Sequence, residues 1–356
     1  MLVLRSIAAI FILVATTFTF ADSIATHERT VTKLADGVYE IRHPDAPDSF
    51  PQGNTTVIIG DRGVFVVDSC LLPSSARQDI AQIKQWTDKP VVFLLNTHWH
   101  FDHNNGNATY AAAWPGIQII AHSHTQKEIA EFNPGAVERY PQRRQRFQKV
   151  LDSGKDESGK PLSEADRLDY QRSLAGLDGV LAEFKDVKVL PPNVSYDHDM
   201  TVNLGNREVQ IKFLGRANTA GDSVVYLPKE KIVMTGDILD HPVPYMFGGF
   251  PADFPNTLRA LRELDATTIV PGHGDIQHDK NYIDQVIAMM DAANAEVRRE
   301  ILQGKKLNEV QELAPKALNE DALKQQFGGD DKDNRDFFEQ SFEGMIKTAF
   351  NQLSER

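Results

Sequence analysis

The sequence predicts an α/β fold in which β-sheets are layered with helices. Short apolar runs bounded by Gly and Asp are typical of strands, and they occur at residues 64–67 and 91–95. Between them, residues 74–87 have helical spacing, with Ile80 and Ile83 on one face. Strand–helix–strand order is characteristic of a layered α/β domain. The 356 residues, 41% hydrophobic and 25% charged, have an ordinary globular composition and leave room for one large domain or two.

The remaining strands and helices of this domain follow from the same patterns. Alternating or continuous apolar runs predict strands, and apolar residues at helical spacing predict helices. Strands are expected at 38–41, 56–59, 117–120, 187–190, 209–214, 223–227, 231–234 and 267–270, and helices at 256–264 and 280–300.

Two segments depart from the strand–helix alternation. Residues 125–185 begin with a capping-box pattern, contain a basic stretch and a polar loop, and end in a long helical pattern, so they predict a helical insertion. Residues 301–356 predict a helical C-terminal extension. Near its end, apolar residues recur at helical spacing and form a stripe: Phe338, Phe342, Met345, Ile346, Ala349 and Leu353. Such a stripe is typical of core packing. A homodimer contact through the C-terminal helix is the second interpretation.

The first 21 residues predict a secretory signal peptide. Arg5 precedes an apolar run at 6–20, and small residues around Ala21 suit cleavage. The run of about fifteen residues is short for a membrane span. We therefore expect a periplasmic or secreted protein without stable membrane insertion after cleavage; an uncleaved anchor is the alternative.

The charge and cysteine content narrow the function classes. The formal net charge is -12, and removing residues 1–21 takes away Arg5 and no acid, which leaves -13. Nucleic-acid binding requires basic patches, so no nucleic-acid partner is expected. Cys70 is the only cysteine, which excludes an intrachain disulfide. A buried, inert thiol is the expected role, and a ligand or nucleophile is the alternative.

The most informative motif is the six-residue segment from His98 to His103, which directly follows the apolar run at 91–95. It contains three histidines and Asp102, whose nitrogen and oxygen donors suit zinc or a similar divalent metal. His98 and His100 are two residues apart and can point the same way from an extended backbone. Asp102 and His103 follow a turn and can face a second point. The spacing predicts a site for up to two metals, against the alternative of a solvated histidine loop.

This motif resembles the signature of the metallo-β-lactamase superfamily, and four further segments match in order. They are 64–68, ending in Asp68; 215–222; 234–237, ending in Asp237; and 269–274, containing His273. The resemblance covers roughly residues 30 to 290. It implies a four-layer αββα sandwich, with the metallo-β-lactamase-like domain at 22–300.

The resemblance also implies the metal ligands. His98, His100 and Asp237 would hold the first metal, whereas Asp102, His103, His273 and the shared Asp237 would hold the second. Asp68 would not bind the metal itself but would fix the orientation of a ligand imidazole. Where the family usually has a further histidine at the first metal, this chain has Asn218. An amide oxygen is a weak neutral donor for zinc, so we expect one zinc held firmly at the second site and a weaker zinc at the first.

His241, four residues after Asp237, belongs to a segment that should border the cleft. It could supply the donor lost at Asn218 or contact substrate. The function expected is an exported zinc-dependent hydrolase, in which metal-bound water, oriented by Asp102 and Asp237, cleaves an ester, lactone, amide or β-lactam bond of a small molecule. The alternatives are a weakly active or non-catalytic binding protein with a partly degraded site, and an iron-dependent redox member of the same fold.

Overall fold

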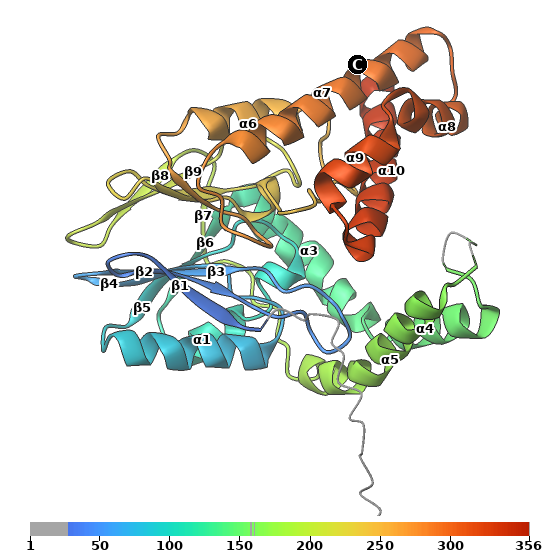
Figure 1. The fold of residues 1–356 in the computed structure, drawn as a ribbon. Coiled ribbons are helices and arrows are strands. Elements are labelled where there is room, and N and C mark those ends of the chain that lie inside the picture. Colours follow the sequence, from blue (N-terminus) through green and yellow to red (C-terminus); the bar gives the residue numbers. More distant parts are fainter. Residues whose placement is uncertain (1–27, 157–158, 160, 356) are drawn as a thin grey trace, which may run out of the picture.

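The fold is that of a computed structural model, which describes residues 28–156, 159 and 161–355 (Figure 1). The predicted signal peptide at 1–21 lies outside the described residues. Within the described part of the chain, none of the helices combines the length and apolarity needed to cross a bilayer.

The first sheet has seven strands in chain order from β1 to β7. β1 to β4 pair antiparallel, and β4 to β7 pair parallel. The parallel strands therefore end at the same edge, and the loops that follow them meet there. The strands are β1 (Thr30–Ala35), β2 (Val38–Arg42), β3 (Thr55–Gly60), β4 (Gly63–Val67), β5 (Val91–Leu95), β6 (Gln118–His122) and β7 (Val194–Tyr196).

The second sheet has five strands in the order β12, β11, β10, β9, β8. Its pairs are antiparallel except for β11 with β12, which run parallel. The ends of β11 and β12 therefore also share one edge. The strands are β8 (Met200–Asn203), β9 (Glu208–Lys212), β10 (Val224–Leu227), β11 (Ile232–Met234) and β12 (Thr268–Val270).

The expected strand at 187–190 is wrong, because the strand that completes the first sheet, β7, begins only at Val194. Pro191 and Pro192 follow the apolar run, and proline fixes φ, lacks an N–H and restricts the residue before it. The carbonyl of Leu190 instead accepts a hydrogen bond from the Asn107 amide at 3.0 Å.

The two sheets pack face to face and helices cover their outer faces, which gives the predicted αββα sandwich (Figure 1). Phe65, Leu95, Val225 and Met234 are among the buried residues between the sheets. Ile83 of α1 and Tyr110 of α2 pack on the first sheet. The outer helices are α1 (Pro73–Trp86) and α2 (Asn107–Ala113) on the first sheet, and α6 (Phe254–Glu263) and α7 (Asn281–Leu302) on the second.

The predicted insertion and extension both form helices. The insertion contains α3 (Ser123–Arg139), α4 (Gln142–Ser153) and α5 (Glu164–Phe184), and the extension contains α8 (Leu307–Ala317), α9 (Glu320–Gly328) and α10 (Lys332–Ser354). The stripe on α10 packs within the chain: Phe338, Phe342, Ile346 and Ala349 are fully buried in the cluster that includes α7. A homodimer through this helix stays a prediction, and it would have to use another face.

Glu40 makes the stability of this fold depend on pH. Its side chain lies on β2 and the residue is 2% exposed. Burial raises the pKa of the Glu40 carboxyl from 4.5 to about 7, against the opposing effects of a Thr32 hydrogen bond and the Arg42 charge. The folded chain therefore keeps this proton where the unfolded chain loses it. This contribution to stability is complete below pH 4.5 and is lost as the pH rises towards 7.

The variant Glu40→Gln is expected to be more stable than the wild type at pH 8. Glutamine is neutral at every pH and close in shape to the protonated acid, so the gain should be on the order of 2–3 kcal/mol. At pH 4 the two chains should unfold with nearly the same free energy. Urea unfolding of both chains at the two pH values measures this, and a pH-independent difference would contradict it.

Candidate metal centre

The motif loops meet at the shared edge of the two sheets. Asp68 follows β4, and the segment from His98 to His103 follows β5 and ends in a short 3₁₀ turn. From the second sheet, Asp237 lies in a 3₁₀ turn after β11, and His273 follows β12. Residues far apart in the sequence therefore converge because each one ends a strand.

The more complete of two clusters, called the second cluster after the second metal of the resemblance, consists of Asp102, His103 and His273, with Asp237 beside them. His103 Nε2 lies 3.0 Å from His273 Nε2 and 3.0 Å from Asp237 Oδ1. Asp102 Oδ2 lies 3.2 Å from His273 Nε2 and 3.7 Å from His103 Nε2. A tetrahedral zinc with bonds of about 2.0–2.1 Å separates its donors by about 3.3–3.4 Å. Asp102, His103 and His273 therefore converge on one point that suits a divalent cation, the second metal of the resemblance, and Asp237 Oδ1 borders that point at 3.0 Å from His103 Nε2 and 3.8 Å from His273 Nε2.

Asp68 fixes the direction in which His103 presents its donor. Asp68 Oδ2 lies 3.0 Å from His103 Nδ1, and the Thr97 amide and hydroxyl each donate to the Asp68 carboxylate at 2.8 Å. The proton on His103 is thus placed on Nδ1, which leaves the Nε2 lone pair facing the other donors. His273 is positioned from its backbone, since its N–H donates to Asp240 Oδ1 at 3.0 Å. Asp240 was not among the predicted site residues.

The other cluster, called the first cluster because it lies at the place of the first metal of the resemblance, is less complete. His98 Nε2 lies 3.1 Å and His100 Nδ1 lies 3.7 Å from Asp237 Oδ2. The amide of Asn218 occupies the next position, with its Nδ2 at 3.5 Å from both His100 Nδ1 and Asp237 Oδ2. His98 Nε2 is buried without a hydrogen-bond partner. The donors of His98, His103 and Asp237 lie close enough together to hold a cation, whereas His100 and the neutral amide of Asn218 lie farther out beside them.

The charges of the centre are mutually dependent. Burial alone would raise the pKa of Asp237, but the imidazoles of His103, His98 and His273 outweigh it and hold that pKa well below its usual range. Burial lowers the pKa of His273, and the Asp237 and Asp102 carboxylates reverse this and raise it to about 9. A cation bound among these carboxylates would displace the imidazole protons.

His241 lies on the wall of the cleft above the centre. Its Nδ1 is 3.6 Å from Asp275 Oδ2, and its ring packs against Tyr282 at 4.9 Å. Its backbone N–H donates to the His273 carbonyl at 3.1 Å. Within the described residues, the groups of donors that converge on one point do not include His241. The structure therefore places His241 beside the second cluster, in a position to contact a ligand in the cleft.

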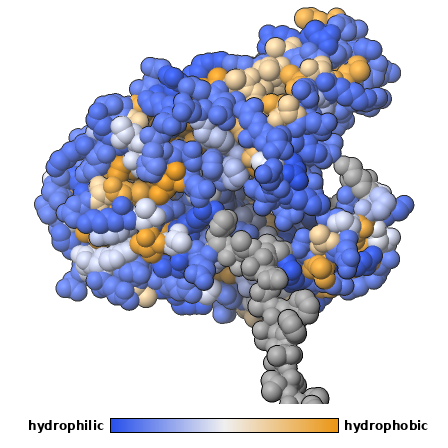
Figure 2. Space-filling model, in the orientation of Figure 1, coloured by the Kyte–Doolittle hydropathy of each residue, from blue (hydrophilic) through white to orange (hydrophobic). Residues whose placement is uncertain are grey.

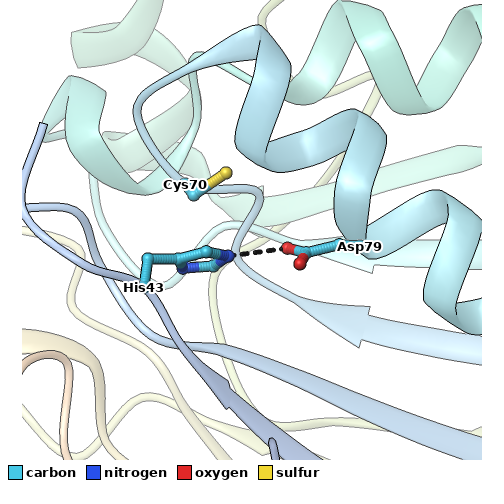
Figure 3. Close-up of side chains that lie close together, drawn as sticks. All are labelled: His43, Cys70 and Asp79. Atoms are coloured by element: carbon cyan, nitrogen blue, oxygen red, sulfur yellow. Dashed lines mark hydrogen bonds and ion pairs between the residues drawn. The ribbon is translucent and has the colours of Figure 1, made fainter. Parts of the chain in front are cut away.

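A further buried group, found by no sequence motif, consists of His43, Asp79 and Cys70 (Figure 3). His43 is only 4% exposed. Its Nε2 bonds Asp79 Oδ2 at 2.9 Å, and its Nδ1 bonds the Gly53 carbonyl at 2.9 Å. Both ring nitrogens thus face acceptors; burial lowers the pKa of His43, but Asp79 and the hydrogen bonds reverse this and raise it. Cys70 is buried beside this pair, where burial raises the thiol pKa well above its usual range.

His43 is hydrogen-bonded to the loop around Gly53, and this loop contacts the second cluster. Gly53, whose carbonyl it binds, donates its own N–H to the Asp102 carbonyl at 3.2 Å. A Cβ on Gly53 would lie 2.4 Å from two atoms of the His103 ring. Only glycine lets the loop approach this imidazole so closely.

The variant Gly53→Ala is expected to displace His103 and weaken zinc binding at the second cluster by about 10–100-fold, as for a lost ligand-supporting contact. Gly179→Ala is the matched control, because a Cβ there meets nothing within 4 Å and alanine favours the helix. Zinc affinity measured by competition with a chelator tests both variants. Equal affinity in Gly53→Ala and the wild type would contradict the role of this close approach.

The centre opens into a cleft of about 890 Å³. Asp102, Asp237 and His273 line its floor, and segments of the insertion and the C-terminal extension line its sides. Asn218 instead faces a neighbouring cavity of about 370 Å³, which shares Trp99 and His100 with the main cleft. The volume of the main cleft suits a small organic molecule.

Fold and site together define a layered α/β protein with a histidine- and aspartate-rich centre for one or two divalent cations. The sequence profile of the metallo-beta-lactamase superfamily matches residues 48–273, and the chain belongs to this superfamily. Metal-dependent hydrolases are among its members.

The chain is similar to several curated proteins. It is 22% identical over 244 residues to a linear primary-alkylsulfatase of Pseudomonas sp. (strain ATCC 19151), which covers 65% of this chain and 43% of that protein. It is 25% identical to the alpha subunit of 2,4-dinitroanisole O-demethylase of Nocardioides sp. (strain JS1661), covering 62% of this chain and 52% of that protein. The chain thus spans about half or less of the length of these relatives.

Solved structures show the same fold. A stereoselective inverting sec-alkylsulfatase from Pseudomonas sp. superimposes with a TM-score of 0.62 at 14% identity, over 91% of this chain and 50% of that one. A metallo-beta-lactamase from Pontibacter korlensis gives a TM-score of 0.54 at 17% identity, over 74% of this chain and 99% of that one.

Proposed function

We propose that this protein is an exported zinc-dependent hydrolase of small molecules. The observation that carries the proposal is the cluster of Asp102, His103 and His273, with Asp237 beside it, at the floor of a cleft of about 890 Å³. A structural metal would be enclosed by protein, whereas a catalytic one keeps an open position. The carboxylates of Asp102 and Asp237 and the His273 ring face the cleft, so a substrate can reach them.

The roles of the residues follow from their positions. When bound, zinc supplies Lewis acidity and makes water a nucleophile at neutral pH. The carboxylates of Asp102 and Asp237 would accept hydrogen bonds from a water at the floor of the cleft and orient it towards the substrate. Asp102 is the better proton acceptor for transfer to the leaving group, because it borders the cleft and its side chain is 10% exposed. Asp68 keeps the proton of His103 on Nδ1, away from the cleft.

The bond cleaved is an ester, lactone, amide or β-lactam bond. The names of the relatives add a sulfate ester to this range, since two of them are alkylsulfatases. A second candidate is a weakly active or non-catalytic binding protein, and the observation that favours it is the neutral amide of Asn218 in the first cluster. We find no feature that favours an iron-dependent redox function over these two.

A substrate panel tests the proposal. The purified chain is stripped of metal and assayed with p-nitrophenyl acetate, a γ-lactone, an anilide, a cephalosporin and dodecyl sulfate, with and without added zinc. We expect zinc-dependent hydrolysis of at least one compound, abolished in Asp102→Ala and retained in His278→Ala, which changes an exposed histidine outside the cluster. Firm zinc binding without hydrolysis of any compound would favour the binding protein.

Export is part of the same proposal and has its own test. Residues 1–21 carry the signal-peptide pattern, and cleavage after Ala21 would make Asp22 the first residue. Expression of the full chain in a bacterium with a periplasm, followed by mass spectrometry of the periplasmic fraction, should give the mass of residues 22–356. The uncleaved mass in the membrane fraction would instead indicate an anchor.

A further inference from the structure

The two added segments bring exposed aromatic rings to the cleft. Phe132 of α3, in the insertion, is 47% exposed, and Phe337 of α10, in the extension, is 38% exposed. Both side chains line the main cleft. The surface is also indented between the insertion helices and the C-terminal helices (Figure 2). Large apolar side chains left in water at the mouth of a pocket are typical of a ligand-binding surface.

Neither ring is needed for the packing of its helix. On α10 the neighbouring Phe338 is fully buried and belongs to the core, whereas Phe337 is exposed and is not part of it. On α3 the buried positions are Thr125, Ile129 and Asn133, and Phe132 is not among them. The exposure of these two rings is therefore not explained by the stability of the helices.

The exposed rings are the ends of one continuous aromatic wall, defined here as Phe132, Trp99, His100, Tyr245 and Phe337. Successive ring centroids are 5.3 Å apart for Phe132–Trp99, 4.6 Å for Trp99–His100, 5.4 Å for His100–Tyr245 and 6.5 Å for Tyr245–Phe337. All five side chains line the main cleft. The wall thus runs from the insertion, past the metal loop, to the C-terminal extension.

We propose that this wall selects ligands that carry an aromatic or similarly flat apolar group beside the polar group that reaches the metal centre. Flat rings gain the most from such a surface, because aromatic pairs add edge and stacking contacts to the burial of apolar area. Phe132 and Phe337 are the residues that determine this specificity for a flat apolar group. The inference rests on the proposed function for the reaction, but its binding part can be tested without turnover.

Two small carboxylate ligands, compared with each other, test the binding part of this inference. Naphthalene-2-carboxylate has a flat ring system beside its carboxylate, and acetate has the carboxylate without the ring. Isothermal titration of the zinc-loaded full chain should give a Kd at least about tenfold lower for naphthalene-2-carboxylate than for acetate, a difference of about 1.4 kcal/mol. Phe337→Ala and Phe132→Ala should each raise the Kd of naphthalene-2-carboxylate about five- to tenfold and leave that of acetate unchanged.

The control is Leu168→Ala on α5, where the side chain is 48% exposed but does not line the cleft. This variant should bind both carboxylates as the wild type does, and Phe337→Tyr should retain most of the preference for the ring. Equal Kd values for the two carboxylates in the wild type, or unchanged values in both alanine variants, would overturn the inference.

The two proposals can fail separately. If the preference for the ring and its loss in the variants are observed but no compound of the substrate panel is hydrolysed, the ligand class is supported and the hydrolase proposal fails. If esters are hydrolysed, but naphthalene-2-carboxylate binds no tighter than acetate, the hydrolase proposal stands and the role of the wall is contradicted.

Discussion

The variant Asn218→His is expected to bind two zinc ions firmly, where the wild-type chain binds one. The amide of Asn218 lies 3.5 Å from His100 Nδ1 and from Asp237 Oδ2, beside the buried donor of His98. An imidazole at this position would complete three nitrogen donors around one carboxylate oxygen, the set that zinc prefers. The neighbouring cavity of about 370 Å³ provides room for the larger ring.

The gain should appear in the weaker of two zinc dissociation constants. Adding the missing donor should lower it by about 10–100-fold, a typical size for a change in metal-site partners. The tighter constant should not change, because Asn218 is not among the donors of the second cluster. Asn218→Gln is the matched control, since it keeps an amide and adds no imidazole. If both variants bind zinc as the wild type does, the lack of a third nitrogen donor is not what weakens zinc binding at the first cluster.

The variant Asp237→Asn is expected to lose metal from both clusters. Asp237 Oδ2 lies 3.1 Å from His98 Nε2, and Asp237 Oδ1 lies 3.0 Å from His103 Nε2, so one carboxylate joins the two sets of donors. An amide offers one weak neutral oxygen and directs an N–H at the other imidazole. The affinity for zinc should fall by more than about 100-fold, beyond the effect of losing a supporting residue, and any zinc-dependent hydrolysis should disappear.

Asp36→Asn is the control for this change, because Asp36 is an exposed carboxylate paired only with Lys33 on the surface. Circular dichroism should show that both variants keep the wild-type secondary structure. An Asp237→Asn chain that still binds one zinc with wild-type affinity would mean that Asp102, His103 and His273 suffice, and that Asp237 is not a bridging ligand.

The loops of the centre were predictable because each one follows a strand with a clear apolar pattern. The segment from His98 to His103 follows β5, and Asp237 and His273 follow two strands that end at the same edge. The order of these motifs along the chain was enough to predict the αββα sandwich. In the folded chain Asn218 Nδ2 lies 3.5 Å from His100 Nδ1, and its role as a ligand stays a prediction.

Other features depend on contacts between distant residues, which no local pattern contains. The role of His43 comes from Asp79, 36 residues away, and from Gly53, whose close approach to His103 is a property of the folded chain. Phe337 belongs to no sequence motif. Its place on the cleft became visible only when α10 was seen beside the metal loops.

The most direct test of the account is a zinc titration of the wild-type chain in competition with a chromophoric chelator. One zinc should bind firmly per chain and a second much more weakly, because Asp102, His103 and His273 converge with Asp237 beside them, whereas the neutral amide of Asn218 leaves the other cluster incomplete. Two zinc ions bound with equal affinity, or no firmly bound zinc, would contradict it.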